Sequence, residues 1–467
     1  MKNLFIYTIA AVLFSTIISA QKIDINKIPE LGPTNIIKLS KPKSFRLENG
    51  LTVMVVENNK LPRVTINLSL QRPLRNDGNI KGVTEIVAEQ LNNGSADLGK
   101  DEFNSRIDFL GAKLQFHSGG AVAICLSKYF PEVLTLMGNA LINPKFSSEN
   151  LKISKQKKID KLFSNEKNAS FIVGRVSNAM LYGKNTARGQ FVSVESISNI
   201  QIEDINNIYK MHFVPNDAYL TIVGDVKFEN IKPLIEKLFI GWKKSIATKE
   251  HLEPAHNVAK TEISLIDIPS ATQSLIAINN LHTLKMNDPR YFPAILCNHI
   301  LGGENGRLFM NLREKNGYTY GAYSNLIVDK NYSEFLASAS VRNEVTDKAI
   351  IEFMKELNAI VDIKPEELED AKIKLKGDFI RSLEKPEKIA TFALEEKVED
   401  LPTSFYTNYL KSIDDVTLND VKNIAKTIIF PNNSRIIIAG KASEISDGLK
   451  KLGYSVKKCD AEGNVID

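Results

Sequence analysis

An internal repeat constrains the fold of this chain more than any other feature of its 467 residues. The segment from Ser196 to Gly224 matches the segment from Ser412 to Gly440 without a gap, at a constant offset of 216 residues. Ten of the 29 aligned positions are identical, and several other pairs are apolar in both copies. Each copy predicts a helix, a turn that contains Pro and Asn, and a buried strand closed by Gly. The repeat therefore predicts two copies of one domain of about 200 residues.

A change of composition between the copies indicates where the domains meet. Residues 244–257 are polar and contain Pro254, as expected of a linker. Each copy mixes hairpin strands with long helices, without strict strand–helix–strand alternation. This pattern predicts an α+β fold in which helices cover one side of a largely antiparallel sheet. We expect a signal peptide at 1–20, an extended lead-in at 21–42, a first domain at 43–243, a linker at 244–257, a second domain at 258–456 and a tail at 457–467 that is disordered from Cys459 onward.

Short-range patterns predict individual elements of the first copy. Two alternating runs between residues 45 and 56 flank Asn49-Gly50, and this dipeptide supplies the positive φ that a tight hairpin turn needs. The other predicted elements are a strand at 64–70, a helix at 103–109, a strand pair at 113–126, a long basic helix at 147–165 and a further helix at 170–180.

The N-terminus has the features of a cleaved export signal. A short start that contains Lys2 precedes an apolar run over residues 4–18, and Ala20 ends a small-residue cleavage site. Gln21 is then the first residue of the mature protein. The alternative is an uncleaved anchor, although the run is short for a membrane span. We expect an exported, periplasmic protein that has no membrane association after cleavage.

The charges, cysteines and histidines exclude several other classes of site. The 60 basic and 55 acidic residues leave a net charge of +5 without a long single-sign run, so nucleic-acid binding is not expected. The three cysteines lie far apart, and their odd number leaves at least one thiol unpaired within the chain. His251 and His256 have no third ligand nearby, so we interpret them as surface histidines of the linker.

The stretch from Gly82 to Ser95 predicts an amphipathic helix that runs into an Asn-Gly turn. Glu85 and Glu89 lie one turn apart on it, and Ala88 lies between them. Two carboxylates at this spacing can bind Mg²⁺ or Ca²⁺ weakly. The plainer interpretation is a solvated helix face. In either case the methyl group of Ala88 cannot take up a proton.

This stretch resembles the active-site segment of the pitrilysin/insulinase family, the inverted-zincin metallopeptidases. The likeness rests on Lys81-Gly82-Val83-Thr84 before the helix, on Asn93-Gly94-Ser95 after it, and on the closing pattern over residues 213–226. It extends over nearly the whole mature chain, including the duplicated domain. The resemblance implies that the two domains together form half of a clamshell.

The resemblance also implies that this helix has lost its zinc chemistry. In the family, two histidines at i and i+4 and a Glu from a later helix hold zinc, and a Glu between the histidines is the general base. Here Glu85 and Glu89 replace the histidines, and Ala88 replaces the base. The third ligand position falls on Lys161, or on Asp160 if the register shifts by one residue. We therefore expect no metal and no other cofactor in this chain.

A glycine-rich segment of the second copy, residues 301–321, matches the family pattern well. It contains Gly302, Gly303, Arg313 and Tyr320. In the family, an Arg and a Tyr seven residues apart face the zinc from the other domain or subunit. The resemblance gives these roles to Arg313 and Tyr320, and substrate binding to both of them and to the two glycines. An Arg fork can hold a peptide carbonyl or a carboxylate, and a Tyr hydroxyl can donate to an oxyanion.

Plainer interpretations of this segment stay open. The glycines could form a phosphate loop, but no Gly-Lys-Ser/Thr and no preceding strand are present. Arg313 could be a surface charge at a helix end. Tyr320 could be a strand residue that packs in the core.

The resemblance implies a division of labour between two chains, because some family members are pairs. We expect a non-catalytic subunit of a heterodimeric zinc peptidase, similar to the inactive partner of bacterial two-chain members and of mitochondrial processing peptidase. It would bind peptide or unfolded polypeptide and place Arg313 and Tyr320 beside zinc held by a zinc-motif-bearing homologous subunit. The alternatives are a catalytically inert peptide-binding or scaffold protein of the same fold and a peptidase with an unorthodox metal site.

Overall fold

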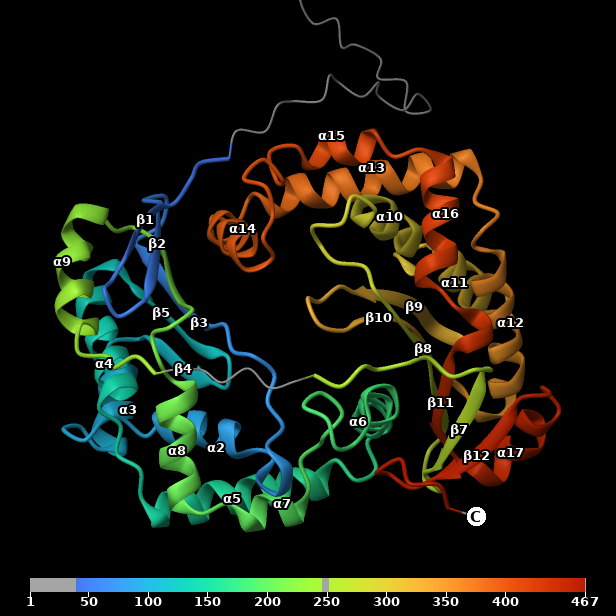
Figure 1. Ribbon diagram of the computed structural model, residues 1–467, viewed down its shortest axis with the longest axis horizontal. Coiled ribbons are helices and arrows are strands. Elements are labelled where there is room, and N and C mark those ends of the chain that lie inside the picture. Colours follow the sequence, from blue (N-terminus) through green and yellow to red (C-terminus); the bar gives the residue numbers. More distant parts are fainter. Residues whose placement is uncertain (1–38, 246–251, 467) are drawn as a thin grey trace, which may run out of the picture. The chain divides into compact units, whose positions relative to one another are not determined.

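The computed structural model describes residues 39–245 and 252–466. The predicted signal peptide, nearly all of the predicted lead-in and His251 lie outside these ranges. Within them the chain forms two six-stranded sheets with helices packed on them, one sheet from each copy of the repeat (Figure 1). The predicted α+β fold with largely antiparallel sheets is confirmed.

The first sheet has the strand order β1-β2-β6-β3-β5-β4. Neighbouring strands are antiparallel except β2 and β6, which are parallel. The predicted hairpin is present, with Phe45 opposite Val53 and with Gly50 at a φ of 99° in the turn. The strands are β1 (Lys43–Arg46), β2 (Thr52–Glu57), β3 (Arg63–Leu70), β4 (Lys113–His117), β5 (Gly120–Leu126) and β6 (Ala218–Gly224).

The second sheet has the strand order β12-β7-β11-β8-β10-β9. Here β7 is parallel to both β11 and β12, and the remaining neighbours are antiparallel. The strands are β7 (Glu262–Asp267), β8 (Gln273–His282), β9 (Thr319–Ile327), β10 (Ser333–Arg342), β11 (Arg435–Gly440) and β12 (Ser455–Cys459).

The two sheets repeat one topology. The strands β2, β6, β3, β5 and β4 take the same order as β7, β11, β8, β10 and β9. The helices of the repeated segment, α8 (Ile202–His212) and α16 (Leu418–Ile428), begin and end at the predicted offset of 216 residues. Only the first edge strand differs, because β1 is antiparallel to its neighbour and β12 is parallel to its neighbour. The duplication inferred from the sequence is therefore visible in the backbone.

Helices of the first copy cover its sheet with their apolar faces. In α2, for example, Val83, Ile86, Val87 and Leu91 are all buried in the same core. The longer helices are α2 (Val83–Leu91), α3 (Lys100–Phe109), α4 (Phe130–Ile142), α5 (Ser148–Ser164), α6 (Ala169–Tyr182), α7 (Val194–Asn199), α8 and α9 (Phe228–Phe239), with short 3₁₀ turns at Gly78–Ile80 and Ser127–Tyr129.

The second copy has the corresponding helices and an irregular segment after the first of them. The helix α10 packs against α16, α13 and β9, as α2 packs against α8, α5 and β4, so α10 is the counterpart of α2. The helices are α10 (Tyr291–Gly302), α11 (Arg307–Phe309), the π-helix η3 (Met310–Lys315), α12 (Thr346–Ala359), α13 (Pro365–Ser382), α14 (Glu387–Val398), α15 (Tyr409–Asp414), α16 and α17 (Ala442–Lys450), with 3₁₀ turns at Asn343–Val345 and Pro431–Asn433.

Each copy also lends one helix to the sheet of the other copy. From the first copy, α6 packs on β8 and β11, where Ile172 and Val176 are buried with Ile437 of the second sheet. From the second copy, α14 packs on β2 and β6, where Ala390 is buried with Val56. The α6 contact includes the larger apolar cluster of the two. This exchange ties the two copies together through side chains distant in sequence.

The end of the chain differs from the tail expected at 457–467, which the sequence predicts to be disordered from Cys459 onward. The strand β12 continues to Cys459, and Lys457 pairs with Glu262 of β7 at 2.6 Å. A turn then returns the chain, so that Cys459 bridges Val465. Arg175 of α6 donates to the carbonyl of Ala461. Tertiary contacts order this segment, and its polar composition does not reveal them.

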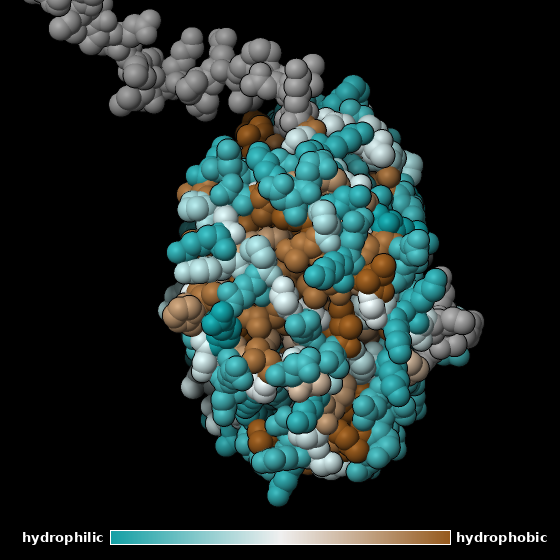
Figure 2. Space-filling model, turned by 90° about the vertical axis from the view of Figure 1, so that its left-hand side faces the viewer, coloured by the Kyte–Doolittle hydropathy of each residue, from teal (hydrophilic) through white to brown (hydrophobic). Residues whose placement is uncertain are grey.

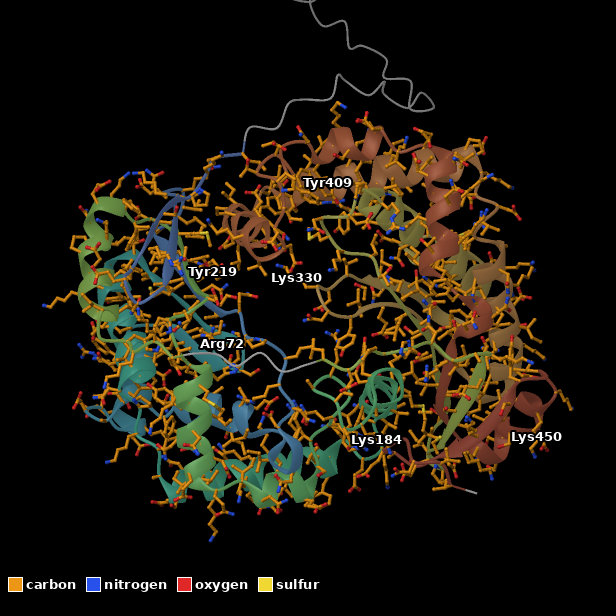
Figure 3. The ribbon with its side chains drawn as sticks, viewed as in Figure 1. Arg72, Lys184, Tyr219, Lys330, Tyr409 and Lys450 are labelled. Atoms are coloured by element: carbon orange, nitrogen blue, oxygen red, sulfur yellow. The ribbon has the colours of Figure 1, made fainter. Side chains whose placement is uncertain are left out.

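Arg72 fixes the turn of the repeat in the first copy (Figure 3). Its guanidinium donates to the carbonyl oxygens of His212 at 2.6 Å and Asn216 at 2.5 Å, and also to that of Val214. Burial lowers the pKa of Arg72 to about 10. A single side chain thus satisfies three carbonyl groups that the turn leaves without ladder partners.

The described chain has apolar residues on its surface and buried cysteines in its interior. Seen from the side that carries α9 and α4, apolar residues gather along the middle of the face and hydrophilic residues frame them (Figure 2). In the described part of the chain, no helix is long and apolar enough to cross a bilayer. The three cysteines, Cys125, Cys297 and Cys459, are free and buried.

Candidate functional site

The helix that the sequence singled out is α2, and a tight turn sets its start. Gly82 caps α2 with a φ of 101°, which is a left-handed conformation that favours glycine. A Cβ at Gly82 would lie 2.7 Å from Cδ1 of Ile197, so the turn also needs the absence of a side chain. This close packing fixes where the first turn of α2, and with it Glu85, lies.

The three degenerate positions have different environments on α2. Ala88 is only 2% exposed and belongs to the core. Glu85 and Glu89 are half-buried, and Oε2 of Glu85 is buried without a hydrogen-bond partner in the described structure. Glu89 lies 3.8 Å from Nζ of Lys157 on α5. These three positions therefore hold two carboxylates and a methyl group, with an ammonium beside Glu89.

The third predicted position does not meet the other two. Lys161 and Asp160 are exposed on α5. Asp160 accepts from Gln156 at 2.8 Å, a contact along its own helix. The residue of α5 that contacts Glu89 is instead Lys157, one turn before Lys161. Because α5 contains many lysines, the sequence alone does not distinguish Lys157 from Lys161, which lies one turn later on the helix.

These residues do not fit a zinc ion. Zinc sites in proteins use three or four Cys, His or carboxylate ligands, and here two carboxylates face a lysine. Throughout residues 39–245 and 252–466, no group of three or more His, Cys, Asp or Glu side chains is arranged to hold a metal ion. Since Ala88 offers no proton acceptor, α2 can neither hold the ion nor activate a water in the way the family motif does.

The glycine-rich segment follows α10, the counterpart of α2. Gly302 is buried, and a Cβ there would lie 2.1 Å from the backbone nitrogen of Ser324 on β9. Helix–strand packing therefore accounts for Gly302 without a substrate. A Cβ at Gly303 would lie 2.5 Å from Nδ1 of His299. The absence of a preceding strand argues against a phosphate loop, because α10 leads into this segment.

Arg313 lies in the π-helix η3 and its side chain is 46% exposed. Its guanidinium stands over the ring of Phe309, 4.7 Å from the centroid, and 3.5 Å from a carboxylate oxygen of Glu314. The ring of Phe309 lies 6.3 Å from that of Tyr323, which is half exposed. Arg313 thus rests on an aromatic surface without a close bidentate partner.

Tyr320 lies at an irregularity of β9. The register between β9 and β10 shifts between Ala339 and Val341, so that Tyr320 and Gly321 of β9 lie opposite the single residue Ser340 of β10. Its side chain is 87% exposed, which excludes a core residue. The neighbouring Thr319 fixes the irregularity, because its hydroxyl donates to the carbonyl of Ser340 at 2.6 Å and accepts from the amide of Gly321 at 3.1 Å.

The two sites therefore differ in what they can do. The α2 site lacks both a metal-binding set and a base. The second segment presents a cation and a phenol hydroxyl to the surroundings, and both can donate hydrogen bonds to a carbonyl, a carboxylate or an oxyanion. Neither group alone can activate a water molecule at neutral pH, so the segment suits binding and charge stabilisation.

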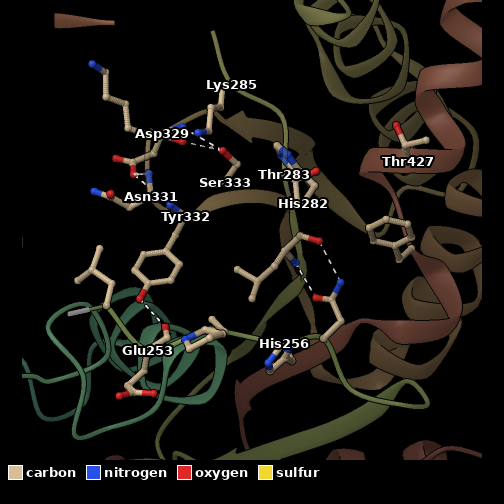
Figure 4. A pocket seen from close by; sticks show the side chains of 17 residues that line it. Glu253, His256, His282, Thr283, Lys285, Asp329, Asn331, Tyr332, Ser333 and Thr427 are labelled. Atoms are coloured by element: carbon tan, nitrogen blue, oxygen red, sulfur yellow. Dashed lines mark hydrogen bonds between the residues drawn. The ribbon is translucent and has the colours of Figure 1, made fainter. Parts of the chain in front are cut away.

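A pocket elsewhere is lined by both acidic and basic side chains. It has a volume of about 660 Å³ and lies between the end of β8, the β9–β10 turn and residues 252–257 (Figure 4). Tyr332 donates to the carbonyl of Glu253 at 2.7 Å, and Ser333 donates to that of Leu284 at 2.6 Å. His256 lines this pocket. Its polar side chains are largely engaged with the backbone, and the predicted site residues are not among those that line it.

Sequence reasoning missed the residues that hold the predicted ones in place. Lys157 was one lysine in a basic helix, and only its contact with Glu89 distinguishes it. Asn311 was an ordinary position of the glycine-rich segment, yet it is 7% exposed and donates to Glu352 and Glu356 of α12. No spacing rule links residues 40 positions apart.

Comparison with known proteins finds similarity to M16 peptidases and to proteins described as zinc proteases. Residues 199–375 match a family model described as the inactive domain of M16 peptidases. The zinc protease PqqE of Helicobacter pylori is 24% identical over 411 residues, which cover 83% of this chain and 90% of that protein. A probable inactive metalloprotease of Bacillus subtilis, YmfF, is 20% identical over 229 residues, which cover 49% and 53% of the two chains.

The fold has solved counterparts. The crystal structure of a peptidase M16 inactive domain from Pseudomonas fluorescens superimposes with a TM-score of 0.77 at 22% identity. The match covers 86% of this chain and 98% of that one. At this level of identity the likeness establishes the shared fold, and the chemistry has to be argued from the residues above.

Proposed function

Because this chain belongs to the pitrilysin (M16) family of peptidases, we propose that it is an exported, non-catalytic subunit of a two-chain zinc peptidase. In this role it binds a peptide or an unfolded polypeptide and presents Arg313 and Tyr320 to a homologous partner that keeps the zinc motif. The zinc ion belongs to the partner. Export is proposed from the N-terminal segment, with cleavage after Ala20.

One observation carries the proposal: this chain lacks the residues of the family's zinc motif but has the Arg and Tyr that the family places opposite the zinc. The zinc helix has lost its ligands and base, and Lys157 lies against it. Arg313 and Tyr320 are retained and project from irregular backbone, 46% and 87% exposed. In the described structure the Tyr320 side chain makes no hydrogen bond, so its donor is free for a partner or a substrate.

The chemistry of the two groups fits an assisting role. The zinc of the partner would supply an activated water. The Arg313 fork would hold a peptide carbonyl or a terminal carboxylate, and its weak contact with Glu314 leaves it free to do so. The Tyr320 hydroxyl would donate to the oxygen on which negative charge develops.

A catalytically inert peptide-binding or scaffold protein of the same fold is the second candidate. The relative described as a probable inactive metalloprotease favours it. The two candidates differ in one measurable property, since only the first needs a zinc-bearing partner to become active.

The test is co-expression of this chain with a zinc-motif homologue from the same organism. We expect neither chain alone to cleave peptides and the pair to do so with about one zinc per pair. Arg313→Ala and Tyr320→Phe should each lower kcat of the pair by about 100-fold or more, the scale seen when one oxyanion donor is removed. Lys315→Ala, an exposed cation of the same π-helix, is the matched control and should keep full activity.

Several outcomes would contradict the proposal. Full activity of a pair that contains Arg313→Ala would exclude the assisting role. A homodimer that binds peptides and gains no activity with the homologue would favour the second candidate. Sequencing of the secreted or periplasmic protein should start at Gln21, and a cytoplasmic, uncleaved protein would exclude export.

A further inference from the structure

Asn311 ties the π-helix that bears Arg313 to a neighbouring helix. Its Nδ2 donates to Oε2 of Glu352 at 2.8 Å and to Oε1 of Glu356 at 2.6 Å, both on α12. Its Oδ1 accepts from Nδ2 of Asn316 at 2.7 Å. The side chain is 7% exposed and both hydrogens of its amide are used. Such a buried and fully satisfied amide holds its backbone in one arrangement.

The same residue closes the π-turn through its backbone. The Asn311 carbonyl accepts from the amide nitrogen of Asn316 at 3.1 Å and from the Asn316 side chain at 2.9 Å. A run of such i+5 bonds makes η3 (Met310–Lys315) a π-helix, a geometry often found at functional sites. Gly317, at a φ of 62°, then turns the chain toward β9.

The first copy of the repeat shows what this segment is without the extra residue. There α3 is α-helical, and its buried Ile107 accepts from the amide of Ala112 at 3.1 Å, after a glycine, Gly111, at a φ of 57°. In the second copy, Leu312 accepts from Tyr318 at 2.9 Å after Gly317. The second copy thus has one more residue between the buried position and the glycine.

The added residue lies in the stretch that begins with Arg313. It widens the turn into a π-helix and shifts every later residue around the helix axis relative to the first copy. We infer that Asn311, by clamping this inserted turn to Glu352 and Glu356, is the positioning residue that sets where Arg313 stands relative to Tyr320. The expected effect on catalysis rests on the proposed function, whereas the hydrogen bonds from Asn311 to Glu352 and Glu356 are a property of this chain.

The charges around Asn311 explain why an amide is needed there. Glu352 and Glu356 are one turn apart on α12, so their carboxylates repel each other unless a donor lies between them. The hydrogen bond from Asn311 lowers the pKa of Glu352. Lys355 approaches Glu352 at 3.4 Å from the solvent side. An acidic residue at position 311 would remove both donors and add a third negative charge.

The experiment compares Asn311→Asp with a rescue variant, first in the isolated chain. Hydrogen exchange should speed up at least tenfold at the amides of Asn316, Gly317 and Tyr318 in Asn311→Asp. In the triple variant Asn311→Asp, Glu352→Gln and Glu356→Gln, the two glutamine amides can donate to the carboxylate at position 311. The exchange rates of these three amides should then return to within threefold of those in the starting protein. Asn230→Asp, which adds the same charge on the exposed face of α9, should leave these rates unchanged.

The second measurement uses the assembled pair. Asn311→Asp should lower kcat at least tenfold with the dissociation constant of the pair within twofold, and the triple variant should recover most of the kcat. Asn316→Ala, a milder change, should act in the same direction if Asn311→Asp fails to fold. Unchanged exchange in both single variants overturns the inference. Faster exchange together with an active Arg313→Ala pair leaves the clamp in place and excludes the proposed function instead.

Discussion

At the scale of single residues, α2 differs from the zinc-binding helix of the family by more than the absence of histidines. Glu89 lies beside Lys157, and both side chains are partly exposed, so this pair adds at most about 1 kcal/mol to stability. Its chemical effect is larger, because an ammonium within 4 Å of a carboxylate competes with any cation that the carboxylate could bind. Reverting one position would leave this competition in place.

His212 should make stability depend on pH. Burial lowers its pKa to about 4, against an ordinary value of 6.5, and Nε2 lies 2.6 Å from the carbonyl of Ser118. The unfolded chain then binds a proton below about pH 6.5 that the folded chain takes up only near pH 4. The contribution of His212 to stability should therefore be nearly constant well above pH 6.5 and fall by about 1–2 kcal/mol by pH 5.

Chemical denaturation at pH 7 and pH 5 checks this expectation. In His212→Gln, the loss between the two pH values should shrink by about 1–2 kcal/mol. His117→Gln, at an exposed position, serves as the control and should leave the loss unchanged. An undiminished loss in His212→Gln would show that other groups carry the acid sensitivity, with the buried His282 first among them.

The sequence identified chemical positions better than it identified their supports. Glu85, Ala88, Glu89, Arg313 and Tyr320 could be located because family spacing marks them, whereas the functions assigned to them stay predictions. The supports depend on tertiary contacts. Lys157 and Asn311 contact residues tens of positions away in the sequence only once helices have packed, and no local pattern reports such a contact.

At the scale of elements, α6 is the helix with the most informative environment. Its apolar residues do not cover the sheet of its own copy but pack on β8 and β11 of the other. Ile172 is 1% exposed and Val176 is fully buried in that cluster. The periodicity of α6 predicts a helix with a buried face, but not which sheet buries it.

Truncation of Ile172 should therefore destabilise the whole chain. Ile172→Ala removes three buried carbon atoms and leaves a cavity, for which a loss of about 2–5 kcal/mol is expected. Ile380→Ala, at a 52% exposed position of α13, is the control and should change the free energy of unfolding by less than about 0.5 kcal/mol. Equal effects of the two substitutions in urea denaturation would exclude the α6 packing.

The hairpin, strands and helices predicted from local patterns are present, and several elements that such patterns do not predict have a common cause. The hairpin, the strand pair at 113–126 and both repeat helices follow from turn residues and apolar period. The π-helix η3 and the register shift beside Tyr320 are held by Asn311–Asn316 and Thr319–Ser340 contacts. The strand β12 forms only because β7 offers it an edge. Periodicity carries no information on any of these.

At the scale of the whole molecule, duplication and helix exchange act together. Each sheet keeps the order of its copy, while α6 and α14 cross to the opposite sheet. Each copy keeps a main core of its own, and the smaller clusters around α6 and α14 join the two copies. The α6 cluster contains nine buried residues from both copies, against three in the α14 cluster, so the α6 contact is the larger of these two apolar links.

This exchange makes a prediction about a divided chain. Residues 39–250 expressed alone would expose the apolar face of α6, which a soluble fragment cannot bury, so we expect aggregation or poor solubility. Co-expression with residues 251–467 should yield a soluble 1:1 complex, because α6 and α14 can then reach their sheets. Size-exclusion chromatography with light scattering measures the stoichiometry.

The control is a charge placed in the shared cluster. Val176→Asp in the first fragment buries an unpaired carboxylate against Ile437 and Ala439 and should abolish co-purification, whereas Ile153→Asp, at a 43% exposed position of α5, should preserve it. A soluble, monomeric first fragment that does not bind the second would mean that α6 folds back on its own sheet. In that case the two copies would be independent domains, and the linker alone would hold together the halves that present Glu85 and Arg313.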